Sequence, residues 1–426
     1  MIEQRREEKP RALLVGIHWK RDESKKRAKR HVEELERLVD TMGGLAVCSE
    51  IVNIDKPHPK YFLGTGKLEE IVNTANNLEC TTLVIDADLS PSQQRNLETA
   101  GGMPVMDRHE VILEIFSRHA STKEASLQVE LATLQYTLPR LKRLWTHLSR
   151  QRGGYKGARG KGEKQIESDR RYIQNRITRI KREIERVRKY RSTQRKRRQE
   201  SVIPTGAIVG YTNAGKSSLL NALSGSEIVV QNQLFATLDP TTREVELGDE
   251  LPCLLTDTVG FIEKLPHDLI ESFSSTLEEA AYADFLIHVM DISDEEVLNH
   301  AHITETVLNE IGAGDKPVIR VFNKIDLVES RMDFDILKNT YPEASFISIR
   351  TKEGINELEE KVRNFIAGRL EQIEADLPSA RYDLISLIHR TGNVLDTKYS
   401  DNHVLLRAVV PKATKNKIHH YIVAPT

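Results

Sequence analysis

Eight residues near the middle of the chain have the types and the spacing of a phosphate-binding loop. The run from Gly210 to Ser217 reads Gly-Tyr-Thr-Asn-Ala-Gly-Lys-Ser and fits the pattern G-x-x-x-x-G-K-[ST]. An apolar strand is predicted before it and a helix after it, so several backbone N–H groups and the helix dipole would point at one small volume. That volume suits the β-phosphate of a nucleotide. Lys216 is expected to reach the β- and γ-phosphates, and the Ser217 hydroxyl is expected to bind Mg²⁺.

Two further segments can complete a site for a nucleoside triphosphate. The run 234–243 is polar, carries several threonines and precedes a predicted strand, so one threonine hydroxyl could reach Mg²⁺ only while a γ-phosphate is present. Chemistry alone leaves open which threonine this is. Asp257-Thr-Val-Gly260 follows another strand, where Asp257 would hold the Mg²⁺ shell and the Gly260 N–H would contact the γ-phosphate.

A fourth motif selects the base. Asn323-Lys-Ile-Asp326 follows a strand, and the Asp326 carboxylate can accept two hydrogen bonds from the N1–H and N2–H₂ edge of guanine. Adenine has no such pair of donors, so the motif predicts GTP and not ATP. Ser348, at the end of the last strand of this region, is placed for a backbone contact near the base. All four motifs lie at the carboxyl ends of predicted strands, where open α/β sheets bind ligands.

Two residues of these motifs bear on hydrolysis. Many GTPases have a glutamine after the Asp-x-x-Gly motif to orient the attacking water. This chain has Phe261 there, which predicts slow hydrolysis unless a partner supplies the missing polarity, although packing alone could also explain it. Asn213 resembles the asparagine at this loop position of potassium-dependent GTPases, which implies a K⁺ beside the phosphates; alternatively, it only satisfies the backbone of its own loop.

The composition is typical of a protein with several globular domains. The chain has 426 residues, of which 29% are charged, and the three cysteines Cys48, Cys80 and Cys253 have no metal-ligand spacing. No apolar run is long enough to span a bilayer, and the charged N-terminus has no apolar signal core, so we expect a cytoplasmic protein. The net charge of −1 hides a strong asymmetry, because residues 140–200 contain 23 basic and six acidic side chains. This segment predicts a polyanionic partner.

The basic segment also has the pattern of a helical hairpin. Apolar residues recur at intervals of three and four in two seams, which indicates two helices packed on each other. Pro139 should kink the first helix. By length, the arms would extend for about 40 Å. The first seam is Leu127, Leu131, Leu134, Leu138, Leu141, Trp145 and Leu148, and the second is Ile166, Ile173, Ile177, Ile180, Ile184 and Val187.

The hairpin is expected to bind RNA rather than to be merely solvated. A glycine-rich tip joins the two helices, and its charges together with those on the second helix could be neutralised by a phosphate backbone. Specific reading of bases is not indicated, because aromatic residues are nearly absent. The predicted RNA contacts at the tip are Arg150, Arg152, Tyr155, Lys156, Arg159 and Lys161. The basic outer face of the second helix comprises Arg170, Arg171, Arg176, Arg179, Lys181, Arg182, Arg186, Arg188 and Lys189.

The whole chain is predicted to be an α/β multidomain protein. An N-terminal α/β domain with a small parallel sheet occupies 1–122, and an antiparallel helical hairpin occupies 123–200. A P-loop GTPase domain with a mostly parallel sheet follows over 201–370, and a linker with Pro378 leads into a small C-terminal α+β domain over 371–426. Residues 63–68, Leu-Gly-Thr-Gly-Lys-Leu, superficially resemble a second phosphate loop, but the spacing favours a turn and a helix start.

The central domain resembles the translation-factor-class GTPases, and the whole chain resembles the HflX family of ribosome-associated GTPases. Nearly the full length carries the resemblance, through the runs 61–67, 130–136, 235–243 and 257–261 and the Gly/Arg tip. It implies binding to the large ribosomal subunit and its rRNA, and splitting of stalled ribosomes, especially under heat stress. It also implies that the threonine on Mg²⁺ is Thr237. We expect a monomer.

The four motifs together predict one site with distinct roles for its residues. We expect Lys216, Thr237 and Gly260 to act in catalysis, and Ser217, Thr237 and Asp257 to hold Mg²⁺, with Asp257 acting through water. The residues expected to bind the nucleotide are Gly210, Tyr211, Thr212, Asn213, Ala214, Gly215, Lys216, Ser217, Ser218, Phe235, Ala236, Thr237, Leu238, Asp239, Asp257, Thr258, Val259, Gly260, Asn323, Lys324, Ile325, Asp326, Ser348, Ile349 and Arg350.

Three functions fit these features. The first is a GTPase that acts on the ribosome, with the nucleotide state controlling how the hairpin engages rRNA. The second is a GTP-dependent accessory of RNA remodelling or RNA modification that grips free RNA. The third is a signalling switch whose helices form a coiled-coil interface with a protein partner. Cosedimentation with ribosomal subunits separates them.

Overall fold

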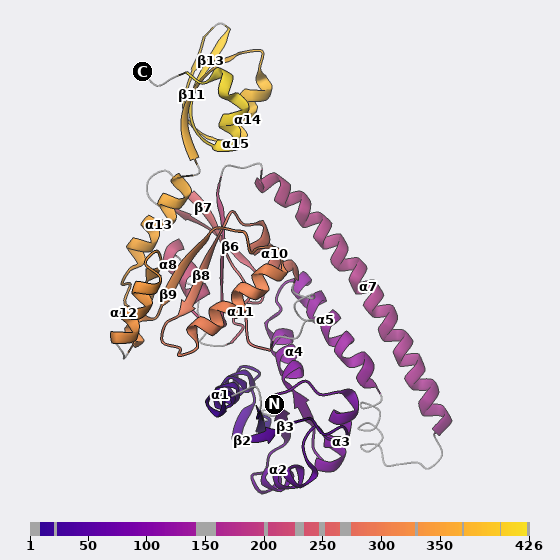
Figure 1. Cartoon of the computed structure of the whole chain (residues 1–426). Helices are drawn as coiled ribbons and strands as arrows, with labels where there is room; N and C mark the ends of the chain where they lie inside the picture. The colour runs from indigo at the N-terminus through magenta and orange to yellow at the C-terminus, as the bar shows by residue number, and fades with distance from the viewer. Residues whose placement is uncertain are drawn as a thin grey trace, which may run out of the picture. The chain divides into compact units, whose positions relative to one another are not determined.

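The structure, a computed structural model, describes residues 9–20, 24–141, 159–199, 203–225, 234–246, 252–264, 274–328, 331–368, 370–400 and 402–423 (Figure 1). The chain forms two compact units. The first comprises 1–184, 231–239 and 264–273, and the second comprises 185–230, 240–263 and 274–426. In the described part of the chain, no helix combines the length and the hydropathy that a bilayer crossing requires.

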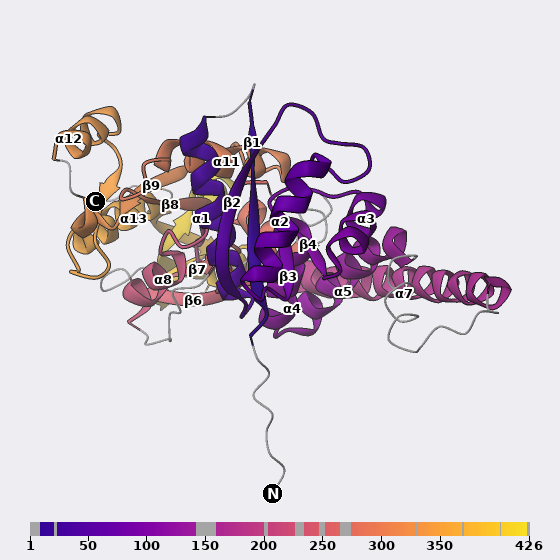
Figure 2. The same ribbon diagram turned by 90° about the horizontal axis from the view of Figure 1, so that it is seen from below.

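A four-stranded parallel sheet is the core of the first unit. Its elements are β1 (Arg11–Trp19), α1 (Lys25–Thr41), β2 (Leu45–Ile54), α2 (Thr65–Asn77), β3 (Thr82–Ile85), α3 (Pro91–Gly101), β4 (Val105–Asp107) and α4 (Arg108–His119). The strand order is β2-β1-β3-β4. Leu13, Val15 and Ile17 of β1 face α2 and α3, whereas Gly16 on the opposite face lies against Val32 of α1 (Figure 2). The predicted α/β domain with a parallel sheet is therefore present.

Local sequence signals define where the helices beside this sheet begin. Ser90 caps α3 and forms a reciprocal capping box with Gln93, and Pro91 occupies the first turn, where its missing N–H costs nothing. The run 63–68 forms a turn and the first turn of α2. The Lys67 ammonium lies 3.0 Å from the carboxylates of both Glu50 and Glu70. Lys67 therefore forms ion pairs within the protein.

The helical region consists of α5 (Lys123–Thr137), the 3₁₀ turn η1 (Leu138–Arg140) and α7 (Arg159–Gln199). The predicted seams meet, because Leu127 and Leu131 of α5 form one buried cluster with Ile180 and Ile184 of α7. Pro139 lies in η1, where the α-helical hydrogen bonding is interrupted, which confirms the predicted break. With 41 residues, α7 spans about 60 Å and is longer than the arm expected from the seam alone.

A six-stranded sheet forms the GTPase domain in the second unit (Figure 1). The strand order is β10-β9-β8-β5-β7-β6, and all neighbours are parallel except β6 and β7. Its elements are β5 (Thr205–Gly210), α8 (Lys216–Ser224), β6 (Thr241–Glu246), β7 (Pro252–Asp257), α10 (Ser274–Tyr282), β8 (Phe285–Asp291), α11 (Val297–Glu310), β9 (Val318–Asn323), η2 (Ile325–Leu327), α12 (Arg331–Thr340), β10 (Ser345–Phe346) and α13 (Ile355–Ala367).

The C-terminal residues form an antiparallel sheet in the order β11-β13-β12 with two helices. The prediction of a linker after 370 is wrong, because β11 pairs with β13 along its whole length. Ile373, Ala375 and Leu377 alternate into the core, a period-two pattern that the proline at 378 obscured. The elements are β11 (Leu370–Pro378), α14 (Tyr382–Thr391), β12 (Asn393–Tyr399), β13 (His403–Pro411), α15 (Lys412–Ile418) and η3 (His419–Tyr421).

Candidate functional site

The predicted phosphate loop joins β5 to α8. The Thr212 N–H donates to the Phe261 carbonyl at 2.7 Å, and the Phe261 N–H donates to the Gly210 carbonyl at 3.1 Å. These two bonds extend the sheet beyond β5 and fix the start of the loop. Gly215 precedes α8 with φ of 101°, a backbone conformation in which a side chain would be strained. The N–H groups at the start of α8 lack intrahelical partners, which is the arrangement that an anion site requires.

Lys216 lies at the centre of this loop and is buried. Its ammonium donates to the Tyr211 carbonyl at 2.8 Å. Burial lowers the pKa of Lys216 to about 8, and the nearby Asp257 carboxylate only partly opposes that change. A Cβ at Gly260 would lie 2.9 Å from the Lys216 Nζ and 2.8 Å from the Thr212 Cα. The Asp-x-x-Gly motif therefore packs directly on the loop, and only glycine fits there.

Two oxygen ligands suitable for Mg²⁺ lie side by side. The Ser217 hydroxyl donates to the Asp257 Oδ2 at 2.6 Å. The next residue, Thr258, donates its hydroxyl to the Ile208 carbonyl at 2.7 Å and so anchors the turn after β7. Mg²⁺ takes hard oxygen ligands and is commonly held by one or two protein oxygens together with phosphates and water. Ser217 and Asp257 fit that ion.

The base end of the site is joined to the phosphate end through Asn323. Its side-chain amide donates to the Ala214 carbonyl at 2.9 Å and its Oδ1 accepts from the Ile349 N–H at 3.3 Å. A Cβ at Gly215 would lie 2.3 Å from the Asn323 Nδ2, which is a second reason for glycine there. The asparagine therefore braces both loops.

Asp326 is oriented by a serine hydroxyl. The Ser348 Oγ donates to the Asp326 Oδ1 at 2.6 Å, and Ser348 is fully buried. Sequence reasoning assigned Ser348 a backbone contact and missed this side-chain bond. It also missed Asp291 at the end of β8, whose carboxylate lies 2.5 Å from the Lys324 Nζ. Arg350 is exposed, and its guanidinium lies 4.0 Å from Asp326.

Phe261 is a packing residue. Its side chain is buried, and its backbone forms a parallel bridge with Tyr211. The Tyr211 hydroxyl accepts from the Glu263 N–H at 2.7 Å, and its ring stacks on His300 with centroids 3.8 Å apart. These contacts hold the segment after Gly260 without providing a polar group at position 261 for a water molecule.

The segment 234–239, here called the sensing segment, belongs to the first compact unit, whereas Ser217 and Asp257 belong to the second. The Phe235 ring is buried and lies 4.7 Å from the Phe116 ring of α4. At the other end, the Asp239 carboxylate accepts hydrogen bonds from Ser121 and Thr122. Ala236 is exposed, Thr237 is half-buried and Leu238 is buried. Residues 235–239, which were predicted to bind the nucleotide, thus pack within the same compact unit as the N-terminal domain.

Lys264, four residues after Gly260, also belongs to the first unit. Its ammonium lies 3.0 Å from both the Asp86 carboxylate and the His31 Nδ1. Asp86 also pairs with the buried Arg108 at 2.9 Å. Burial alone would raise the pKa of Asp86, but the Arg108 and Lys264 cations hold it below its ordinary value. No sequence pattern indicated this buried charge network.

The predicted RNA contacts are only partly described. Arg150, Arg152, Tyr155 and Lys156 lie outside the described residues. Arg159 and Lys161 are in the first turn of α7 and not in a connector. Along α7, Arg176 does not face outward as predicted, since it forms a two-pronged bond with Glu130 of α5 at 2.6 and 2.7 Å.

The outer face of α7 nevertheless keeps a dense basic surface. Some of its cations pair with glutamates one turn away, as Arg179 does with Glu183 at 3.0 Å. Exposed pairs of this kind contribute little free energy and exchange readily for another anion. The remaining exposed cations, which have no carboxylate partner among the described residues, are Arg170, Lys181, Arg182 and Arg186.

Comparison with known proteins identifies the family. Three family descriptions match consecutive stretches: GTP-binding GTPase N-terminal over 29–117, GTP-binding GTPase Middle Region over 119–198, and 50S ribosome-binding GTPase over 205–324. GTPase HflX of Akkermansia muciniphila is 45% identical over 423 residues, which is 97% of each chain. The chain belongs to the HflX family of GTPases. GTPase HflX of Escherichia coli is 41% identical over 86% of this chain and 85% of its own.

This HflX-family chain therefore hydrolyses GTP to GDP and phosphate. A solved structure, the complex of SsGBP with GDP, has a TM-score of 0.50 and 28% identity and covers 84% of this chain and 99% of its own. When bound, Mg²⁺ supplies positive charge beside the β- and γ-phosphates, and Ser217 and Asp257 are the residues of the second unit that would hold it.

Proposed function

We propose that this GTPase binds the large ribosomal subunit and uses GTP binding and hydrolysis to split or rescue stalled ribosomes, under heat or other stress. The observation that carries the proposal is the exposed basic face of α7 in a chain of the HflX family of GTPases. Multiple cations along one helix suit a phosphate backbone, whose bound counterions are released on binding. The rRNA is the partner with that chemistry on a large subunit.

The residues have distinct roles in this proposal. Lys216 binds the β- and γ-phosphates, and Asp326 accepts hydrogen bonds from the guanine edge. Thr237 joins Ser217 and Asp257 on Mg²⁺, while the Gly260 N–H contacts the γ-phosphate, so both report whether that phosphate is present. Hydrolysis then changes what the hairpin can bind, which makes the nucleotide a timer for ribosome contact.

Ribosome binding is tested by cosedimentation through sucrose gradients with GMPPNP. We expect comigration with 50S subunits, reduced at least tenfold in a variant with Lys181, Arg182 and Arg186 changed to Gln. A matched variant with exposed cations of other elements changed to Gln (Lys29, Lys338 and Lys398) should bind normally. Neutralising Arg150, Arg152, Arg159 and Lys161 tests the tip in the same way. Binding only to free RNA would instead support an RNA-remodelling or RNA-modification accessory.

The ribosome is also proposed to stimulate hydrolysis. Phe261 offers no polar group to a water molecule, so the missing polarity has to come from a partner. We expect 50S subunits to raise GTP turnover at least tenfold in a phosphate-release assay. Equal turnover with and without subunits would contradict this part of the proposal.

A potassium ion is proposed as an additional cofactor. Asn213 lies in the phosphate loop with φ of 60°, and asparagine tolerates this left-handed conformation better than most residues. Its side chain could add an oxygen ligand for K⁺ beside the phosphates. We expect hydrolysis to be faster in KCl than in NaCl at equal ionic strength. Equal rates would leave Asn213 with the backbone role alone.

A further inference from the structure

The Asp239 carboxylate holds the start of the hairpin. Its Oδ2 accepts from the Ser121 N–H at 3.0 Å, the Ser121 hydroxyl at 2.6 Å and the Thr122 N–H at 3.0 Å. Its Oδ1 accepts from the Thr122 hydroxyl. Burial alone would raise the pKa of Asp239, but these bonds hold it below its ordinary value. Four donors from two adjacent residues thus converge on one carboxylate.

Those two residues begin α5. Thr122 is the N-cap of the helix, and its hydroxyl accepts from the Ala125 N–H at 3.1 Å. N–H groups at a helix start lack intrahelical partners, and a negative charge beside them is favourable. Asp239 therefore completes the cap of α5, although it is 117 residues away from Thr122 in the chain. Asp239, two positions after the proposed Mg²⁺ ligand Thr237, thus contributes to the first turn of the hairpin.

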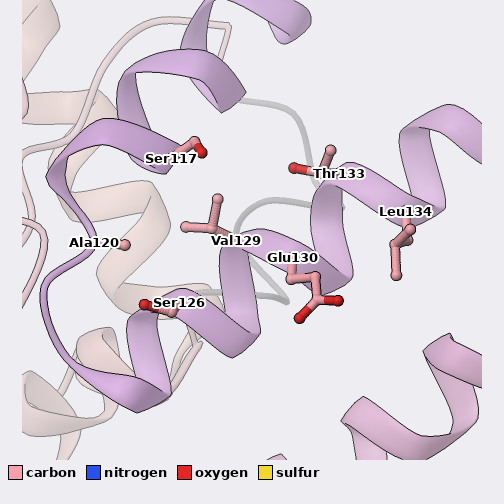
Figure 3. Close-up of a pocket in the computed structure, with 7 residues that line it drawn as sticks. All are labelled: Ser117, Ala120, Ser126, Val129, Glu130, Thr133 and Leu134. Carbon is pink, nitrogen blue, oxygen red and sulfur yellow. The ribbon is translucent and has the colours of Figure 1, made fainter.

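An open pocket of about 260 Å³ lies between the end of α4 and α5 (Figure 3). Ser126, Val129 and Thr133 of α5 and Ser117 of α4 line it. Ala125 and Leu127 are buried, so the first two turns of α5 are held by apolar packing as well as by the hydrogen bonds at their start.

The sensing segment is held at both ends. Phe235 adopts φ of 55°, a conformation unfavourable for an aromatic residue, and its ring packs edge-on against Phe116. Pro240 follows Asp239 and restricts the backbone on the other side. Thr237 lies between these anchors. A displacement of Thr237 by a few Å therefore moves Phe235, Asp239 or both.

We propose that Asp239 is a positioning residue that links the nucleotide state to the helical hairpin, by capping α5 to an extent that depends on whether Thr237 is engaged with the γ-phosphate site. The proposal rests on the proposed role of Thr237. Linkage is reciprocal, so the nucleotide changes the stability of the first turn of α5 and the cap changes the relative affinity for GTP and GDP. In this proposal, a movement of Thr237 is transmitted through Asp239 to the first turn of α5, and the rest of α5 need not move.

The test is a mutant cycle on the full chain with GDP and GMPPNP as probes. We expect Asp239→Ala to change the ratio of GMPPNP to GDP dissociation constants at least fivefold and to speed hydrogen exchange of the Ser121 and Thr122 amides about tenfold. Ser121→Ala should change the ratio in the same direction by about twofold, and the double variant should match Asp239→Ala. Asp315→Ala, an exposed aspartate of the GTPase domain, is the control.

Two outcomes overturn the proposal. One is faster amide exchange in Asp239→Ala with a ratio within twofold of the unchanged protein, because the cap is then structural only. The other is unchanged exchange at Ser121 and Thr122, because the contact then contributes nothing. If Thr237→Ala leaves the affinity ratio unaltered while Asp239→Ala changes it, the linkage stands and the role given to Thr237 is wrong.

Discussion

The nucleotide site and the N-terminal domain hold their functional residues in different ways. In the GTPase domain, the residues expected to contact phosphate and base are held by one another, as Asn323 is by Ala214 and Asp326 by Ser348. The sensing segment and Lys264 are held instead by residues of the N-terminal domain. The residues expected to bind phosphate and base are thus held within the GTPase domain. The segment that carries Thr237, the residue proposed to contact Mg²⁺ beside the γ-phosphate, is held by the N-terminal domain.

Breaking the N-terminal charge network should have the largest effect. Arg108 is fully buried between Asp86 and Glu34, so Arg108→Met leaves carboxylates without their main partner. We expect a loss of about 3–5 kcal/mol in the free energy of unfolding of the first unit. Urea denaturation monitored by circular dichroism measures it. Replacing Glu34, Asp86 and Arg108 together by apolar residues should recover much of the loss, and no recovery would contradict the electrostatic cause.

His288 of the GTPase domain is a buried titratable residue that, unlike Arg108, has no ion-pair partner in the described part of the chain. Both ring nitrogens of His288 lack a hydrogen-bond partner among the described residues, and burial lowers its pKa to about 4. The unfolded chain binds that proton near pH 6.5, so His288 stabilises the fold above pH 6.5 and this stability is lost as the pH falls towards 4. We expect a loss of about 3 kcal/mol from this residue. In His288→Leu the corresponding slope between pH 6.5 and 4 should disappear, as urea titrations at each pH would show.

Removing the charge at the base end should lower affinity without affecting the fold. Asp326→Asn replaces two charge-assisted acceptors by one neutral acceptor and adds a donor that opposes the guanine edge. We expect GTP affinity to fall about 100-fold, and affinity for the xanthine nucleotide to rise, because xanthine presents an acceptor there. Titration with fluorescent nucleotides measures both. Equal losses for the two bases would point to a misfolded loop.

The smallest predicted effect is the pH dependence of nucleotide binding. The protonated Lys216 binds phosphate, and burial lowers its pKa to about 8, so its contribution is present below pH 8 and declines above it. We expect the affinity for GDP to fall by up to about tenfold per pH unit above 8. Calorimetry at pH 7, 8 and 9 would show this. Lys216→Arg stays charged and should bind with a flatter pH profile, and an equal slope would exclude Lys216 as the titrating group.

The sequence predicted local features well and long-range contacts poorly. The phosphate loop, the Asp326 motif and the two apolar seams are patterns of neighbouring residues. The two motifs are found where they were expected, and so is the described part of the seams, whereas Trp145 and Leu148 lie outside the described residues. The strand β11 was missed because Pro378 suggested a linker, although Ile373 and Ala375 alternate into the core. The bonds of Asp239 and Lys264 join residues more than 100 positions apart, and hydroxyls or carboxylates of that kind occur throughout the surface.

The helix α7 has a mechanical consequence. It contributes residues to both compact units, with the division at Ile184, and it contains neither glycine nor proline from Glu163 to Gln199. An uninterrupted helix bends only gently, so it behaves as a stiff rod about 60 Å long. Tilting such a rod by about 5° at one end displaces the other end by about 5 Å. A change of a few degrees beside the GTPase domain is thereby magnified into a movement comparable to one helical turn at the far end.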